Sequence, residues 1–377
     1  MNPSTLCVHG CKDPNDTTGA VTVPVYQCAT FAHPGLGETS GYDYARLQNP
    51  TREQLETLVG ALEQADDCLA FGTGMAAIAV LTELLAPGDA LIASDDLYGG
   101  TVRLLDKVCA KNGVRVDYCD TGDLSAVAAL LGEHTRLVLA ETPSNPMMHI
   151  TDIAALAELV HESGAWLAVD NTFLTPYFCQ PLTLGADIVI HSGTKYLGGH
   201  NDALAGFLAV RGTDLREKLR FLYKTIGAIV APWESYLLIR GIKTLAIRME
   251  RAQSNAQRIA AFLREQPAVT QVLYAGLPDA PGYEISRKQA SGFGAMISFY
   301  VDSADRAEQV LSRLRLIQFA ESLGGVESLL TYPLLQTHAD VPEETRARLG
   351  INDRLLRLSV GIEDAEDLLA DLAQALK

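Results

Sequence analysis

Short runs of apolar residues, each ending in polar or glycine residues, constrain the fold of this chain more than any other feature of its sequence. Examples are residues 90–93, 137–140, 166–169 and 188–190, and segments with helical periodicity separate them. Strands without polar positions are typical of parallel sheets that are covered by helices on both faces. We therefore expect an α/β protein with a mostly parallel main sheet.

The sequence pattern divides the chain into three segments. Residues 1–48 contain many prolines and glycines, which prevent a long helix or strand, so we expect an extended arm. Residues 49–232 carry the apolar runs and form the expected large domain. Residues 233–377 form a smaller α/β domain, hinged on a long helix. Its expected elements are a helix over 233–266, a strand over 295–301 and helices over 304–314 and 363–376.

Charge and hydropathy argue against several classes of partner. The chain has 30 Lys and Arg against 46 Asp and Glu, and the resulting formal charge of −16 repels nucleic acid. The sequence shows no basic N-terminal segment followed by an apolar run, and no uncharged apolar stretch of about 18 residues. We expect a cytoplasmic protein that binds neither nucleic acid nor membranes.

The seven cysteines are scattered and odd in number, which favours free thiols over a disulfide framework. Cys7, His9 and Cys11 lie close enough in the sequence to suggest a metal site. Because no second cluster could complete a tetrahedral site, we expect no bound metal.

Polar residues follow two of the apolar runs, at the carboxyl ends of strands where α/β sheets bind ligands. Asp170 follows the run 166–169, and Lys195 follows the run 188–190 and precedes a glycine-rich loop. Alone, Asp170 could be a turn or helix-capping residue, and Lys195 could be a surface lysine. On neighbouring strands the pair suits pyridoxal 5′-phosphate (PLP), because a carboxylate keeps the pyridine nitrogen protonated while an amine binds the aldehyde.

A glycine-rich turn precedes a helical segment near the start of the large domain, and the exposed amides of such a helix start can bind phosphate. Its residues Gly72, Gly74 and Ala77 also fit a dinucleotide fingerprint, with Asp95 and Asp96 near the expected position of a ribose ligand. A nicotinamide-dependent dehydrogenase is therefore an alternative. It explains neither the carboxylate and lysine at the strand ends nor the arm. Bound PLP would make the protein yellow, whereas bound NAD would not.

Five motifs occur in order along the chain. They are YDYARLQNPTR (42–52), ETPSNP (141–146), AVDNTF (168–173), HSGTKYLGGHNDALAG (191–206) and RLSVGIED (357–364). With them the chain resembles the PLP-dependent enzymes of Cys/Met metabolism, which include cystathionine γ-synthases, cystathionine γ- and β-lyases, methionine γ-lyases and O-acetylhomoserine sulfhydrylases. The resemblance implies a fold-type I transferase fold like that of aspartate aminotransferase. It also implies PLP as cofactor, sulfur-containing amino acids as substrates and a homotetramer with shared sites.

The resemblance further implies roles for individual residues. Lys195 would be the Schiff-base lysine that later moves protons, and Tyr98 would stack on the cofactor ring and take part in catalysis. The implied cofactor-binding residues are Lys195, Asp170, Tyr98, Gly74, Met75, Ser192 and Thr194, with Tyr44 and Arg46 reaching the phosphate of a neighbouring subunit. The implied substrate-binding residues are Arg357 at the α-carboxylate, Asn145, Ser322 and Glu321, with Arg103 and Asp43 at the far end of the substrate.

Two positions favour reactions at the γ-carbon. Glu321 resembles the glutamate of γ-synthases and γ-lyases, and Gly100 stands where methionine γ-lyases have a cysteine. We therefore expect γ-elimination or γ-replacement at cystathionine or an O-acyl-homoserine. Cystathionine β-lyase and O-acetylhomoserine sulfhydrylase remain alternatives, and the direction, synthesis or breakdown, stays open.

A regulatory or structural protein that keeps only the fold is an alternative from outside the enzymes. The joint presence of Lys195, Asp170, Tyr98 and Arg357 argues against it, because a decayed site should have lost at least one of them.

Overall fold

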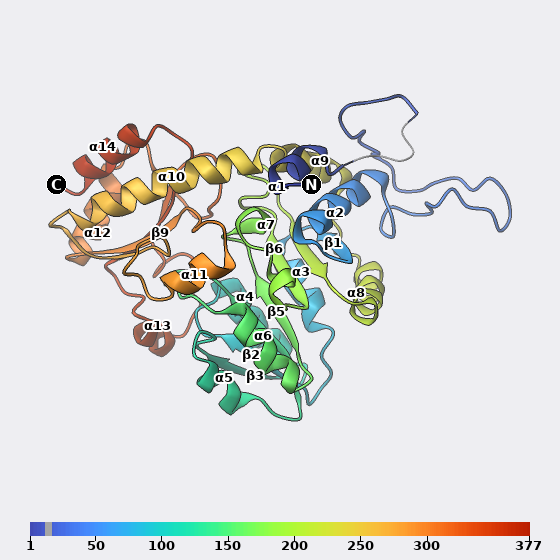
Figure 1. Ribbon diagram of the computed structural model, residues 1–377, viewed down its shortest axis with the longest axis horizontal. Coiled ribbons are helices and arrows are strands. Elements are labelled where there is room, and N and C mark those ends of the chain that lie inside the picture. Colours follow the sequence, from blue (N-terminus) through green and yellow to red (C-terminus); the bar gives the residue numbers. More distant parts are fainter. Residues whose placement is uncertain (12–16) are drawn as a thin grey trace.

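The larger of two sheets confirms the expected mostly parallel arrangement (Figure 1). The computed structural model describes residues 1–11 and 17–377, so residues 12–16 of the expected arm lie outside the described residues. The sheet has the strand order β1-β7-β6-β5-β4-β2-β3, and all neighbours are parallel except β7, which is antiparallel to β6 and β1. Its strands are β1 (Asp67–Phe71), β2 (Ala90–Ser94), β3 (Arg115–Cys119), β4 (Thr135–Glu141), β5 (Trp166–Asp170), β6 (Ile188–Ser192) and β7 (Gly206–Val210).

The central strands of this sheet are apolar on both faces, whereas the edge strand β3 carries Arg115 and Asp117. In β4, Leu137 and Leu139 belong to one buried cluster, whereas Val138 and Ala140 belong to another. Successive side chains of a strand point to opposite faces, so an uninterrupted apolar run must be covered twice. Helices α2 and α6 contribute to one of these clusters and helices α3 and α8 to the other.

Several helices of this part begin where the sequence supplies a capping side chain, and the first two are examples. Asn49 caps α2 (Pro50–Glu63) by accepting hydrogen bonds from the Thr51 and Arg52 N–H groups, and Thr73 caps α3 (Gly74–Thr82) by accepting one from the Ala76 N–H. The remaining helical segments are α4 (Gly99–Leu104), a π-helical turn η1 (Leu105–Cys109), α5 (Leu124–Leu130), α6 (Ile153–Glu162), α7 (Thr175–Phe178), a 3₁₀ turn η2 (Pro181–Leu184) and α8 (Thr213–Ile226).

A second sheet occupies the C-terminal part of the chain, with the order β10-β11-β12-β9-β8. Only its β10–β11 pair is parallel. Its strands are β8 (Val269–Leu273), β9 (Met296–Val301), β10 (Gln318–Phe319), β11 (Leu329–Thr331) and β12 (Leu355–Ser359). The helices of this part are α9 (Pro232–Ile242), α10 (Leu245–Arg264), α11 (Tyr283–Gln289), α12 (Ala304–Arg313), α13 (Glu343–Leu349) and α14 (Ala365–Ala375).

The helix expected over residues 233–266 is two helices, α9 and α10, with a break at Lys243 and Thr244. Near the break, a Cβ on Gly241 would lie 2.2 Å from the Gly198 carbonyl oxygen, so α9 ends in close contact with the loop that follows β6. Arg248 of α10 donates to the Gly241 carbonyl oxygen at 2.9 Å. Helix α10 then runs on to the second sheet and links the two parts of the molecule (Figure 1).

The N-terminal segment combines a short helix with an extended loop. Helix α1 (Pro3–His9) packs against α2, α7 and α10, and its Cys7 is buried. Residues 17–49 contain no helix, and although Val23 and Asn49 are buried, other parts of this stretch loop away from the body of the molecule (Figure 1). The expected boundaries at residues 48 and 232 stay predictions. Across the part of the chain that the structure describes, every helix is too short or too polar to cross a membrane.

Candidate active site

The carboxyl ends of three neighbouring parallel strands meet at one edge of the large sheet. Glu141 at the end of β4 pairs in register with Asp170 at the end of β5, and Asp170 pairs with Ile190 of β6. Lys195 follows β6. The residues around this edge enclose a cavity of about 220 Å³, whose lining includes Gly74, Met75, Tyr98, Thr101, Glu141, Asn145, Asp170, Ser192, Thr194, Lys195, Glu321, Ser322, Thr337 and Arg357.

The structure thus brings together eleven of the residues implied by the resemblance, including both of the expected catalytic residues. The cavity lies between the two sheets, because Glu321, Ser322 and Arg357 come from the C-terminal part. A wider hollow of about 910 Å³ lies elsewhere, beside α2 and α8, and contains neither Lys195 nor Asp170. The smaller cavity is therefore the candidate active site.

Lys195 presents its amine inside the cavity. The Nζ atom donates to the Ser322 hydroxyl at 2.9 Å. Burial and the nearby Arg357 cation lower the pKa of Lys195 to about 8, and only Glu321 acts in the opposite direction. A lysine with this pKa is neutral in a substantial fraction of molecules near neutral pH, so it can attack an aldehyde and accept a proton.

The backbone of Ser322 is in an uncommon conformation, with a φ of 94°. A side chain in the left-handed region costs on the order of 1–3 kcal/mol, and such residues cluster at functional sites. The cost is offset locally, because the Ser322 carbonyl oxygen accepts from Arg357 Nη2 at 3.2 Å. This conformation holds the hydroxyl against the lysine.

Asp170 carries a half-buried carboxylate and lines the cavity. Its Oδ1 accepts from the Thr172 backbone N–H at 3.0 Å, but burial still raises the pKa of Asp170. Because burial disfavours the ionised carboxylate, a neighbouring cation would stabilise it strongly. The protonated nitrogen of a pyridine ring is such a cation, so Asp170 fits PLP.

The turn between β1 and α3 supplies backbone donors for a phosphate. The first N–H groups of a helix have no partner within the helix, and they attract anions together with the helix dipole. Close packing holds this turn in place: a Cβ on Gly206 of β7 would lie 2.2 Å from the Thr73 carbonyl oxygen, and one on Gly74 would lie 3.2 Å from Ser192 Cβ. Gly74, Met75 and Ser192 all line the cavity, so two amides of the helix start and a hydroxyl suit a phosphate group there.

Arg357 is a buried cation in the opposite wall, with 1% of its surface exposed. Its Nη1 donates to Asn145 Oδ1 at 2.7 Å, and burial lowers the pKa of Arg357 to about 10. Within the described residues no carboxylate forms an ion pair with it. A guanidinium held in this way by neutral partners is suited to bind the carboxylate of an amino acid with two parallel hydrogen bonds.

Tyr98 stands at the start of α4 with 41% of its surface exposed. A Cβ on Gly100 would lie 2.4 Å from Tyr98 Cε1, so the present position of the ring requires a glycine there. The Tyr98 backbone N–H donates to Glu141 Oε2 at 3.2 Å. The ring is thereby fixed at the rim of the cavity, where it can cover a planar cofactor.

The sequence motifs assign no function to Glu141, although it is the first residue of ETPSNP (141–146). Burial and the neighbouring Asp170 raise the pKa of Glu141 well above its usual range. Its position after the run 137–140 follows the same strand-end rule that points to Asp170. That rule is the signal that could have identified it.

Four of the residues implied by the resemblance lie outside the cavity of this chain. Arg103 is exposed and forms an ion pair with Asp340. Asp43, Tyr44 and Arg46 belong to the arm, where the Arg46 guanidinium lies over the Tyr44 ring at 5.7 Å from its centre. Their expected roles at a substrate's far end and in a neighbouring subunit stay predictions.

Comparison with known proteins agrees with this geometry. Residues 4–377 match the family model described as Cys/Met metabolism PLP-dependent enzyme. The chain is 47% identical to a cystathionine γ-lyase of Bacillus subtilis over 377 residues, 100% of both chains. It is 46% identical to a cystathionine β-lyase of Lactococcus lactis over 373 residues, which cover 99% of this chain and 98% of the relative.

A solved structure of cystathionine γ-synthase from Xanthomonas oryzae in complex with cystathionine has a TM-score of 0.96 and 39% identity to this chain. The match covers 100% of this chain and 98% of the other. The expected fold-type I architecture is confirmed.

The lowered pKa of Lys195 predicts how the cofactor-free protein captures PLP. Because the neutral amine is the reactive form, the capture rate should rise with pH through a midpoint near the pKa of about 8, and not near the ordinary 10.5. Stopped-flow absorbance of the yellow product measures this rate, with Lys195→Ala as the blank. Arg357→Met should move the midpoint up and Glu321→Gln should move it down, since the two groups act on the lysine in opposite directions. A rate that is still rising steeply at about pH 10 would contradict the assignment.

Proposed function

Because the chain belongs to the Cys/Met metabolism family of PLP-dependent enzymes, we propose that it catalyses γ-elimination or γ-replacement at cystathionine or an O-acyl-homoserine. The observation that carries the proposal is that one cavity contains both Lys195, whose pKa is lowered, and Arg357, a buried cation without a carboxylate partner among the described residues. Lys195 can remove a proton from the α-carbon of an amino-acid substrate, and Arg357 can bind its α-carboxylate.

Each side chain of the site has a defined task in this reaction. Bound PLP supplies an aldehyde that takes up amines and a protonated ring that stabilises negative charge at the substrate's α-carbon. Arg357 holds the α-carboxylate and so fixes which bond at the α-carbon faces Lys195. Lys195 removes the α-proton through Nζ and can return it at a neighbouring carbon. Asp170 keeps the positive charge on the ring nitrogen, and Tyr98 covers the ring and handles a proton near the leaving group.

The position of Glu321 supports reaction at the γ-carbon. Glu321 lines the cavity next to Ser322, and its negative charge stabilises the protonated form of Lys195. Loss of a γ-substituent requires a second proton to be removed, from the β-carbon, so the lysine must hold the α-proton, pass it on and then act as a base again. The resemblance of Glu321 to the glutamate of γ-synthases and γ-lyases also supports reaction at the γ-carbon.

A second candidate is β-elimination from cystathionine. It is favoured by the relative from Lactococcus lactis, which is named a β-lyase and is 46% identical over 373 residues. O-acetylhomoserine sulfhydrylase activity is the remaining alternative within the family.

We further propose a homotetramer built from dimers, in which the arm of one subunit completes the cavity of another. Tyr44 and Arg46 would then bind the cofactor phosphate of the neighbour, which accounts for their distance from the cavity of their own chain. The unpaired cysteines suit the reducing conditions of the cytoplasm, where we place the protein.

A substrate panel tests the reaction type. With cystathionine, γ-elimination should release 2-oxobutyrate, whereas β-elimination would release pyruvate. With O-succinylhomoserine and cysteine, γ-replacement should give cystathionine. Lys195→Ala should lose all of these activities, because no other group of the cavity supplies the amine. Pyruvate as the main product from cystathionine would replace the γ-proposal by the β-proposal, and turnover by Lys195→Ala would contradict both.

Arg103 and Asp340 form a matched pair for testing how the substrate's far end is bound. If Arg103 binds a distal carboxylate, Arg103→Ala should weaken kcat/KM for cystathionine or O-succinylhomoserine by about 1.5–3 kcal/mol, and affect O-acetylhomoserine far less. Asp340→Asn should act in the opposite direction, because it removes the carboxylate that competes for Arg103. Equal losses on both kinds of substrate would show that Arg103 does not contact the substrate.

A further inference from the structure

The part of the arm that carries Tyr44 and Arg46 is ordered by its own backbone. The Phe31 N–H donates to the Asp43 carbonyl oxygen at 3.0 Å, and the Ala45 N–H donates to the Ala29 carbonyl oxygen at 2.8 Å. Two stretches of the arm are thus paired like the strands of a hairpin. Whatever fixes the base of this pair also fixes the direction of the residues that it carries.

The first turn of α2 fixes this base. Arg52 Nη1 donates to the Ala45 carbonyl oxygen at 2.7 Å, and Ala45 lies between Tyr44 and Arg46 in the sequence. We call Asn49, Thr51, Arg52 and Glu53 the arm clamp. Its other contacts are Asn49 Nδ2 to the Tyr26 carbonyl oxygen at 2.9 Å, Thr51 Oγ1 to the Pro24 carbonyl oxygen at 2.8 Å, the Tyr26 N–H to Thr51 Oγ1 at 2.9 Å, and the Tyr42 hydroxyl to Glu53 Oε2 at 2.7 Å.

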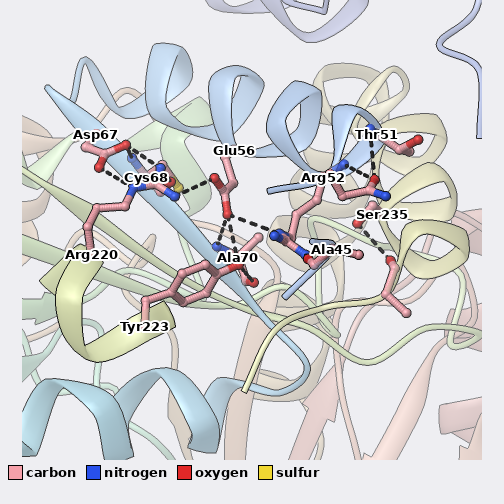
Figure 2. Close-up of polar contacts among 12 residues, drawn as sticks. Ala45, Thr51, Arg52, Glu56, Asp67, Cys68, Ala70, Arg220, Tyr223 and Ser235 are labelled. Atoms are coloured by element: carbon pink, nitrogen blue, oxygen red, sulfur yellow. Dashed lines mark hydrogen bonds and ion pairs between the residues drawn. The ribbon is translucent and has the colours of Figure 1, made fainter. Parts of the chain in front are cut away.

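The position of Arg52 is itself fixed by a buried carboxylate, Glu56 (Figure 2). Arg52 Nε lies 3.7 Å from Glu56 Oε1, and only 1% of the Arg52 surface is exposed. Glu56 Oε1 also accepts from the Ala70 N–H at 3.1 Å and from the Tyr223 hydroxyl at 3.0 Å, while its Oε2 lies 2.9 Å from Arg220 Nη1. Ala70 belongs to β1, which leads directly into the phosphate-binding turn. One carboxylate therefore joins the base of the arm to the strand that carries this turn.

Burying the charged Arg52 guanidinium costs desolvation free energy. Apolar side chains of similar volume are often as stabilising as a buried ion pair, so the guanidinium needs a reason beyond packing. Its planar group supplies that reason, because Nη1 donates to the peptide between Tyr44 and Arg46 while the charge lies within ion-pair distance of Glu56.

We propose that Arg52 is a positioning residue for the active site of the neighbouring subunit. Held by Glu56, it fixes the peptide that carries Tyr44 and Arg46, and so determines how these two side chains meet the cofactor phosphate of the partner. This role rests on the proposed sharing of sites between subunits. It gives a physical function to the NPTR part of the first motif, which contributes no residue to the cavity of its own chain.

The first measurement is the PLP affinity of the cofactor-free protein, titrated by the yellow absorbance of PLP bound at Lys195. Arg52→Met should weaken this affinity about tenfold or more, the effect of weakening a charge-assisted hydrogen bond between Arg46 and the phosphate. The fold should survive, because Glu56 keeps its contacts with Ala70, Tyr223 and Arg220. An unchanged affinity would overturn the proposal.

The second measurement asks which subunit the defect belongs to. Arg52→Met chains are mixed with Lys195→Ala chains under conditions that exchange subunits, and only the former can give the yellow signal. In mixed dimers the arm comes from a chain with an intact clamp, so a fraction of the Arg52→Met cavities should recover the wild-type affinity.

Arg220→Met is the matched control. It also removes a guanidinium from Glu56, but Arg220 contacts Asp67 and not the arm. Any loss of affinity in Arg220→Met should stay with its own chain and show no recovery on mixing. Tyr42→Phe, which removes one clamp contact without leaving a cavity, provides a milder variant whose smaller defect should also recover.

Arg46→Ala in the same mixture separates failure of this proposal from failure of the shared site. If Arg46→Ala recovers on mixing and both Arg52→Met and Tyr42→Phe do not, the positioning role is wrong while the shared site stands. If Arg46→Ala also shows no recovery despite demonstrated subunit exchange, the shared site is wrong and the positioning role falls with it.

Discussion

The parallel register of β4, β5 and β6 is the constraint on which the rest of the site depends. Parallel strands end at the same edge of a sheet, so Glu141, Asp170 and the segment leading to Lys195 arrive together. Both faces of these strands are buried, and the polar groups at their ends therefore sit in an environment that penalises unpaired charge. Burial raises the pKa of Asp170 and lowers that of Lys195 to about 8, and these two shifts prepare one group for a cation and the other for an aldehyde.

The second sheet contributes further residues to the site that the first sheet forms, and we propose that the arm does so in a neighbouring subunit. β12 contributes Arg357, whose charge lowers the pKa of Lys195 and can also bind a substrate carboxylate. The arm leaves the body of the molecule from a base that Arg52 and Glu56 tie to β1. The cofactor phosphate would thus be held between a turn of one chain and an arm of another, both anchored on equivalent strands.

Features with a local cause could be predicted from the sequence, and features that depend on distant contacts could not. Apolar runs indicate the parallel sheet because burial on both faces removes polar residues from a strand, and the strand-end rule then identifies Asp170 and Lys195. Glu141 obeys the same rule, but its bond to the Tyr98 amide depends on how β4 lies against the start of α4. The break before α10 has no local signal, because buried residues continue at helical spacing on both of its sides. The surface ion pair of Arg103 joins segments that are far apart in sequence.

The central claim is that Lys195 binds PLP covalently in the cavity between the two sheets. Reduction of the purified, PLP-loaded protein with borohydride, followed by mass spectrometry of its peptides, tests this claim most directly. The account predicts a pyridoxyl group fixed on the peptide that contains Lys195 and on no other lysine peptide in comparable amount. A pyridoxyl group mainly on another lysine, or none on a protein that binds PLP, would contradict it.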